Sequence, residues 1–182
     1  MTDAPGWPDA IIALGSNIAP RDNLAAALAL LAERLELAGL SNVYRSPALG
    51  RPEQPDFLNA ACRVRPRPPA TRLEPRRLKA DVLRPIEARL GRRRTPDTYA
   101  ARPIDLDIAL CGPLVIDEPG LRIPDPDIRT RPFLAVPLYE LVPDAVLPDT
   151  GEELSAIVQA LPQKDLTIEP DFSKQLKARY QL

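Results

Sequence analysis

Three arginines followed by two aspartates stand close together in one short stretch of the chain. They are Arg92, Arg94, Arg102, Asp105 and Asp107. Side chains of an extended strand alternate between its two faces, so both aspartates should point to one side and the apolar residues among them to the other. These apolar residues are Ile104, Leu106, Ile108 and Leu110.

Two neighbouring carboxylates raise each other's pKa and destabilise a sheet unless a cation or donor neutralises them. Mg²⁺ carrying a polyphosphate suits such an oxygen-only pair, and the guanidinium groups would hold the other phosphate oxygens. The alternative for the aspartates is a half-exposed strand whose polar residues face water. For the arginines it is a solvated basic loop, which we prefer for Arg89 and Arg93. The two groups together favour a phosphate and metal site.

The composition limits the remaining chemistry. A length of 182 residues fits one domain with a core. The formal net charge of −1 gives no overall attraction to nucleic acid or to a membrane. The chain has no histidine, which excludes Ser-His-Asp hydrolysis, His-ligated zinc and histidine base catalysis. We therefore expect chemistry based on carboxylates, arginines and a hard metal ion.

The sequence also indicates the cellular environment. Residues Met1 to Pro8 lack the basic start and apolar run of a signal peptide, and no apolar segment is long enough to span a bilayer. We expect a cytoplasmic protein, monomeric or weakly dimeric. Cys62 and Cys111 lie in apolar runs, which favours two buried thiols and leaves a disulfide between them open.

Hydrophobic periodicity predicts strands that alternate with helices. Strands are expected at 10–14, 40–45, 58–65 and 104–110, and helices at 23–37, at 75–90 with a kink at Pro85, and at 152–161. Residues 133–138 form a short helix or strand. The order β-α-β-β-α-β predicts an α+β fold of the ferredoxin-like type, an antiparallel sheet with covering helices and a C-terminal extension.

Four stretches in this order resemble the 6-hydroxymethyl-7,8-dihydropterin pyrophosphokinase family. They are Ile12-Ala-Leu-Gly-Ser-Asn17; Tyr44-Arg-Ser-Pro47 with Gln54-Pro-Asp-Phe-Leu-Asn59; Ile86-Glu-Ala-Arg-Leu-Gly-Arg92-Arg-Arg94; and Arg102-Pro-Ile-Asp-Leu-Asp107. The resemblance implies Mg²⁺-dependent transfer of pyrophosphate from the co-substrate ATP to a pterin alcohol, with AMP as the other product. It makes residues 1–162 a pyrophosphokinase-like domain, and we assign residues 163–182 to a polar tail that packs on the surface or stays mobile.

The resemblance also implies roles for individual residues. Two magnesium ions would bind at Asp105 and Asp107, and Arg92, Arg94 and Arg102 would act in catalysis on a mobile loop. Pterin binding is implied for Ser46, Pro47, Leu49, Phe57, Asn59 and Phe133, with the two rings sandwiching the heterocycle and the amide bonding its polar edge. ATP binding is implied for Glu87, Tyr99, Asp125 and Arg131. Core positions for the phenylalanines and a solvent-facing Glu87 remain alternatives.

Two departures from the family pattern affect this expectation. The family usually has Trp-Gly-Pro-Arg where this chain has Tyr99-Ala100-Ala101-Arg102. The loop of this chain is therefore expected to close differently over the phosphates. It commonly has Pro-His-Pro or Pro-His-Tyr where this chain has Pro124-Asp125-Pro126, so an acid replaces a cation donor. A divergent paralogue with a modified pterin or reduced activity is therefore an alternative.

A ferredoxin-like nucleic-acid-binding module is a further alternative, from a different functional class. Its exposed sheet should carry stacking aromatics, whereas the strands at 59–65 and 104–110 contain none. We therefore expect pterin and ATP as the partners, and neither nucleic acid nor membrane.

Overall fold

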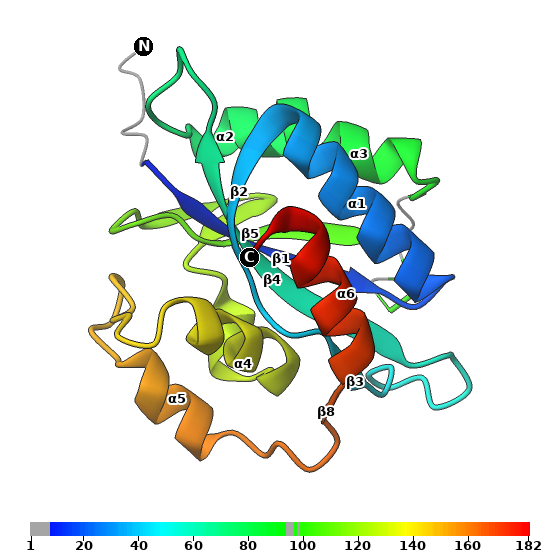
Figure 1. The fold of residues 1–182 in the computed structure, drawn as a ribbon. Coiled ribbons are helices and arrows are strands. Elements are labelled where there is room, and N and C mark those ends of the chain that lie inside the picture. The colour runs from blue at the N-terminus through cyan, green and yellow to red at the C-terminus, as the bar shows by residue number, and fades with distance from the viewer. Residues whose placement is uncertain (1–7, 94–96, 98) are drawn as a thin grey trace.

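A six-stranded antiparallel sheet lies between two layers of helices in the computed structural model (Figure 1), which describes residues 8–93, 97 and 99–182. The strand order is β5-β1-β4-β3-β8, and β2 also pairs with β4. The strands are β1 (Ala10–Ser16), β2 (Leu35–Leu40), β3 (Tyr44–Ser46), β4 (Phe57–Pro66), β5 (Asp105–Leu110) and β8 (Thr167–Ile168). A separate hairpin pairs β6 (Ile116–Glu118) with β7 (Leu121–Ile123).

Helices cover both faces of this sheet (Figure 1). One face carries α1 (Pro20–Arg34), α6 (Pro170–Tyr180) and a continuous helical segment made of α2 (Pro75–Arg77), the π-helical η1 (Leu78–Leu83) and α3 (Arg84–Arg89). The other face carries α4 (Pro132–Leu141), α5 (Leu154–Ala160) and the short 3-10 turn η2 (Pro126–Arg129). The two layers enclose separate apolar cores, so the central strands are buried on both sides. No helix of the described residues is long and apolar enough to cross a membrane.

The predicted mixture of helices with an antiparallel sheet is confirmed, but the second strand differs from the prediction. The first helix ends at Arg34 rather than Leu37, because Leu35 already pairs with Pro66 of β4. What the periodicity indicated as one strand at 40–45 is the end of β2 followed by β3, both of which pair with β4. The sheet is therefore larger than the four strands of the expected ferredoxin-like order.

A register shift in β5 changes the face on which its last residue lies. Ile12 of β1 pairs with Ile108, whereas Ile11 pairs with Leu110. Ile108 packs in the core under α1, but Leu110 packs in the core under α4. The expectation that Leu110 shares a face with Ile108 was wrong, because a bulge interrupts the alternation on which it relied.

A π-helical turn lies just before Pro85, where the sequence predicts a kink. Proline has no backbone N–H, so it cannot donate the hydrogen bond that continues an α-helix. The preceding Arg84 donates instead to the carbonyl of Lys79, five residues back. The helical segment thus runs from Pro75 to Arg89 and holds one additional residue in its middle turn.

The segment after residue 162 joins both the sheet and the core. Ile168 of β8 pairs with Tyr44 of β3, and Phe172 and Leu176 of α6 are buried in the core that α1 covers. The carboxylate of Glu169 binds Arg21 at 2.7 Å and Arg45 at 2.6 Å. The segment assigned to a polar tail therefore adds a strand to the sheet and buried side chains to the core, although most of its residues are exposed.

We predict that Phe172→Ala lowers the free energy of unfolding by about 3–5 kcal/mol, because it opens a cavity in the core beneath α6. Urea denaturation followed by circular dichroism measures this change. Lys174→Ala, on the exposed side of the same helix, should change the free energy by less than about 0.5 kcal/mol. Equal midpoints for the two variants would show that α6 adds nothing to the stability of the core.

Candidate active site

A cavity of about 320 Å³ lies where β1, β4 and β5 meet the first turn of α4. It collects almost all residues that the sequence singled out, although they are far apart in the chain. Its lining includes Ser46, Pro47, Leu49, Phe57, Asn59, Tyr99, Arg102, Asp105, Asp107, Asp125, Arg131 and Phe133. Glu87 and Arg92 lie outside the lining, and Arg94 lies outside the described residues.

Small residues of the central strand β1 form the floor of the cavity. Gly15 lies between Asn59 of β4 and Asp105 of β5, and Ala13 lies beside Asp107. Directly opposed residues in an antiparallel sheet share a face. A Cβ on Gly15 would be 3.3 Å from the Oδ1 atom of Asn59. Gly15 therefore leaves open the space that joins the Asn59 side of the cavity to the aspartate side.

Two arginines neutralise the first aspartate of β5. Both Arg92 and Arg102 donate to the carboxylate of Asp105. Burial alone would raise the pKa of Asp105, but the hydrogen bonds and positive charges of these arginines hold that pKa below its ordinary value. Asp105 is therefore an anion in contact with two cations at the cavity wall.

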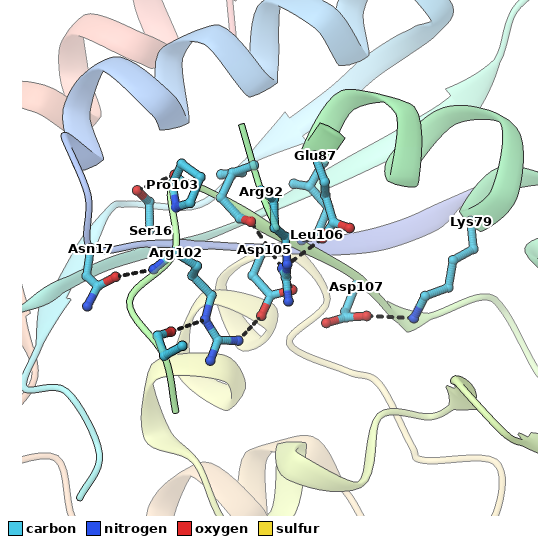
Figure 2. A network of polar contacts seen from close by, with 12 residues as sticks. Ser16, Asn17, Lys79, Glu87, Arg92, Arg102, Pro103, Asp105, Leu106 and Asp107 are labelled. Carbon is cyan, nitrogen blue, oxygen red and sulfur yellow. Dashed lines mark hydrogen bonds and ion pairs between the residues drawn. The ribbon is translucent and has the colours of Figure 1, made fainter. Parts of the chain in front are cut away.

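The second aspartate has a different partner. Lys79 of η1 donates from Nζ to Oδ1 of Asp107 at 2.7 Å. Figure 2 shows Lys79 reaching Asp107 from one side while Arg102 reaches Asp105 from the other. The aspartates thus share the cavity face of β5, as the strand alternation predicted, and each is neutralised separately.

Glu87 supports this arrangement from behind the strand (Figure 2). Its side chain is buried, accepts a hydrogen bond from the backbone N–H of Leu106 at 3.0 Å, and binds Arg92 at 2.9 Å. It is therefore not solvent-facing. These contacts fasten α3 to the outer edge of β5 and hold Arg92 beside Asp105.

Two polar residues at the end of β1 hold the segment that leads into β5. The amide oxygen of Asn17 accepts from the backbone N–H of Arg102 at 2.8 Å, and its nitrogen donates to Gln54 at 3.2 Å. The hydroxyl of Ser16 donates to the carbonyl of Pro103 at 2.6 Å. Asn17 thus fixes the backbone that carries Arg102.

The opposite half of the cavity is mainly apolar and contains one buried amide. Phe57 of β4 and Phe133 of α4 both line it, and Phe133 also packs against the core under α4. The amide nitrogen of Asn59 donates to the Ser46 hydroxyl at 2.9 Å, which fixes the orientation of the amide. The guanidinium of Arg102 lies 5.8 Å from the centre of the Phe57 ring, where the two halves meet.

A third wall comes from the segment between β7 and α4. Asp125 accepts from the N–H of Asp127 at 2.9 Å and caps η2. Burial raises the pKa of Asp125 to about 6, with smaller contributions from nearby charges. Arg131 precedes α4, and its buried Nε has no hydrogen-bond partner among the described residues. This wall therefore offers both a cation and a weakly acidic group.

Sequence reasoning missed three residues of this site. Asp127 lines the cavity, Gly15 forms its floor, and Lys79 binds Asp107. A glycine within a strand indicates close approach of another group, so the role of Gly15 could have been predicted from the sequence. Lys79 carried no such signal, because its place depends on the π-helical turn.

The aspartate pair suits a hard metal ion that arrives with phosphate. Asp105 and Asp107 both line the cavity from one strand face, and both offer only oxygen. Within the described ranges, no group of three or more potential metal-binding side chains is placed to hold an ion. Mg²⁺ commonly takes one or two carboxylates and fills its remaining positions with water and substrate phosphates. The donor set fits that pattern.

Known proteins resemble this chain along most of its length. Residues 11–143 match the family model for 7,8-dihydro-6-hydroxymethylpterin-pyrophosphokinase. A 2-amino-4-hydroxy-6-hydroxymethyldihydropteridine pyrophosphokinase from Haemophilus influenzae is 36% identical over 164 residues, covering 88% of this chain and 98% of its own. The protein of that name from Pseudomonas aeruginosa is 39% identical over 155 residues, covering 83% and 90%.

A solved structure agrees at the level of the fold. The Plasmodium falciparum HPPK-DHPS crystal structure with pterin and p-hydroxybenzoate has a TM-score of 0.64 and 11% identity. It covers all of this chain, which spans only 44% of that longer protein. By sequence match and shared fold, the chain belongs to the 7,8-dihydro-6-hydroxymethylpterin-pyrophosphokinase family.

Proposed function

We propose that this protein transfers the terminal pyrophosphate of ATP to the hydroxymethyl group of 6-hydroxymethyl-7,8-dihydropterin. The products are AMP and the pterin diphosphate, as part of folate synthesis. One observation carries the proposal: an aromatic and amide half and a carboxylate and arginine half line the same cavity, joined across Gly15. A flat heterocycle with an attached alcohol matches the first half, and a polyphosphate with its cation matches the second.

The aromatic half would bind and orient the pterin. The rings of Phe57 and Phe133 would contact the two faces of the heterocycle. The Asn59 amide, held by Ser46 at 2.9 Å, would bond the polar edge of the heterocycle. The alcohol would then lie toward Arg102, where the two halves of the cavity meet. Holding both reactants in one orientation removes much of the entropic barrier to the reaction.

The charged half would bind the polyphosphate. Asp105 and Asp107 would hold Mg²⁺, which when bound supplies positive charge to the phosphate oxygens. Arg102 would leave Asp105 for a phosphate oxygen, since guanidinium groups bind both anions through the same fork of donors. The Nε of Arg131, which has no partner among the described residues, would donate to the same phosphate groups. Together these cations would stabilise the negative charge that develops during transfer.

The reaction forms one bond and breaks one. The alcohol oxygen attacks the β-phosphorus of ATP, and the bond from that phosphorus to the oxygen shared with the α-phosphate breaks. The electron pair leaves with AMP, and the alcohol proton passes to solvent. Arg92 and Arg94 are assigned to the same phosphate groups, on the segment that enters β5.

Product analysis tests the proposed reaction. We predict that the protein incubated with Mg²⁺, ATP and hydroxymethyl-dihydropterin forms AMP and pterin diphosphate in equal amounts, as measured by ³¹P NMR. Omission of the pterin should abolish AMP formation. Accumulation of ADP with a pterin monophosphate would identify an ordinary kinase and refute the proposal.

We predict that Asp105→Asn lowers turnover by about 10²-fold or more, because it removes a charge that would hold the metal ion. Pterin affinity, measured by calorimetric titration, should stay close to that of the wild type. Asp117→Asn on the exposed β6–β7 hairpin is the matched control and should leave both quantities unchanged. Wild-type turnover by Asp105→Asn would remove this residue from the metal site.

We predict that Asp125→Asn tightens binding of a nonhydrolysable ATP analogue several-fold at pH 7.5. The pKa of Asp125 is about 6, so above that pH its carboxylate is charged and repels the polyphosphate. At pH 5 the wild-type group is protonated, and the two proteins should bind the analogue alike. Calorimetric titration at both pH values measures the difference, and equal affinities at pH 7.5 would show that Asp125 does not face the phosphates.

A further inference from the structure

Lys79 has an unusual position for a lysine on a surface helix. Its side chain is only 14% exposed, and its Nζ lies 2.7 Å from Asp107. It is absent from the cavity lining and approaches Asp107 from the helical side of β5 (Figure 2). Lysine side chains are seldom this buried without a charged partner. Its buried stem and its contact with Asp107 direct one positive charge at the second aspartate.

The π-helical turn brings Lys79 to this point. Lys79 and Glu87 are eight residues apart, whereas about seven residues make two full turns of an α-helix. The additional residue in the π-helical turn compensates for the difference, so both side chains face β5. Glu87 binds the N–H of Leu106 while Lys79 binds the side chain of the next residue, Asp107. The helical segment therefore fastens two successive residues of β5.

The charge of Lys79 acts on more than Asp107. Burial is the largest effect on the pKa of Asp125 and raises it, while the charge of Lys79 opposes that rise. The charges of Asp107 and Asp127 raise the pKa of Asp125, whereas the charge of Lys79 lowers it. Lys79 therefore balances the acidic groups on the side of the cavity away from Arg102.

We propose that Lys79 is a positioning residue that holds Asp107 and makes divalent cation binding at this site depend on an accompanying polyphosphate. This inference rests on the function proposed above. A divalent cation without phosphate would add two positive charges beside Lys79, and like charges repel strongly at such short range. A polyphosphate brings enough negative charge to offset both cations. Metal and nucleotide would then bind together rather than separately.

Manganese titration followed by electron paramagnetic resonance tests this coupling, because it counts free Mn²⁺ without any turnover. Lys79→Met removes the charge and keeps an apolar stem. We predict about tenfold tighter Mn²⁺ binding than in the wild type when nucleotide is absent. With a methylene-bridged ATP analogue present, the Mn²⁺ affinities of the two proteins should differ much less. The analogue should therefore raise the Mn²⁺ affinity of Lys79→Met by a smaller factor than that of the wild type.

Three further variants separate charge from structure. Lys79→Gln keeps a donor without charge and should behave like Lys79→Met. Lys79→Arg keeps the charge and should behave like the wild type. Lys79→Met combined with Ala80→Lys moves the charge to the neighbouring exposed position at unchanged net charge, and it should behave like Lys79→Met. Thermal unfolding of each variant verifies that the fold is intact.

Two results would overturn the inference. Folded Lys79→Met and Lys79→Gln proteins that bind bare Mn²⁺ no more tightly than the wild type would show that Lys79 only supports the structure. Wild-type protein that binds no Mn²⁺ even with nucleotide would instead refute the proposed function, and the inference with it. The first result leaves the proposed function standing, so the two failures are distinguishable.

Discussion

Two like charges held side by side on one face of β5 are the constraint that organises this molecule. Asp105 and Asp107 would repel each other and weaken the edge of the sheet if they were left alone. Separate parts of the chain prevent this: Arg92 follows α3, Arg102 leads into β5, and Lys79 comes from the π-helical turn. The same pairing gathers beside the cavity the cations that a polyphosphate would attract.

The architecture around this pair brings the two unlike halves of the cavity together, as the proposed reaction requires. β1 lies between β4 and β5, so its small residues separate the amide of Asn59 from the carboxylate of Asp105 by a single strand. Gly15 adds no side chain at that point, and α4 closes the opposite side with Phe133. The distance between the aromatic half and the charged half of the cavity is thus set by the hydrogen-bonded backbone of the sheet.

Strand alternation and helical periodicity predicted part of the site from the sequence. Both failed where the backbone departs from regular geometry. Strand alternation correctly set Asp105 and Asp107 on one face. The same rule misassigned Leu110, because a bulge lies before it. Helical periodicity likewise gave no sign of Lys79, whose direction depends on an additional residue in the helix. The family resemblance supplied the remaining cavity residues, such as Phe133, which no local pattern could connect to β4.

The central claim is that Asp105 releases Arg102 when phosphate arrives, and that both carboxylates of β5 then bind a metal ion. A crystal structure with Mg²⁺ and a nonhydrolysable ATP analogue tests this most directly. The account predicts Mg²⁺ within about 2.1 Å of both Asp105 and Asp107, with Arg102 moved from Asp105 to a phosphate oxygen and Lys79 still bound to Asp107. Metal bound elsewhere, with Arg102 still on Asp105, would contradict it.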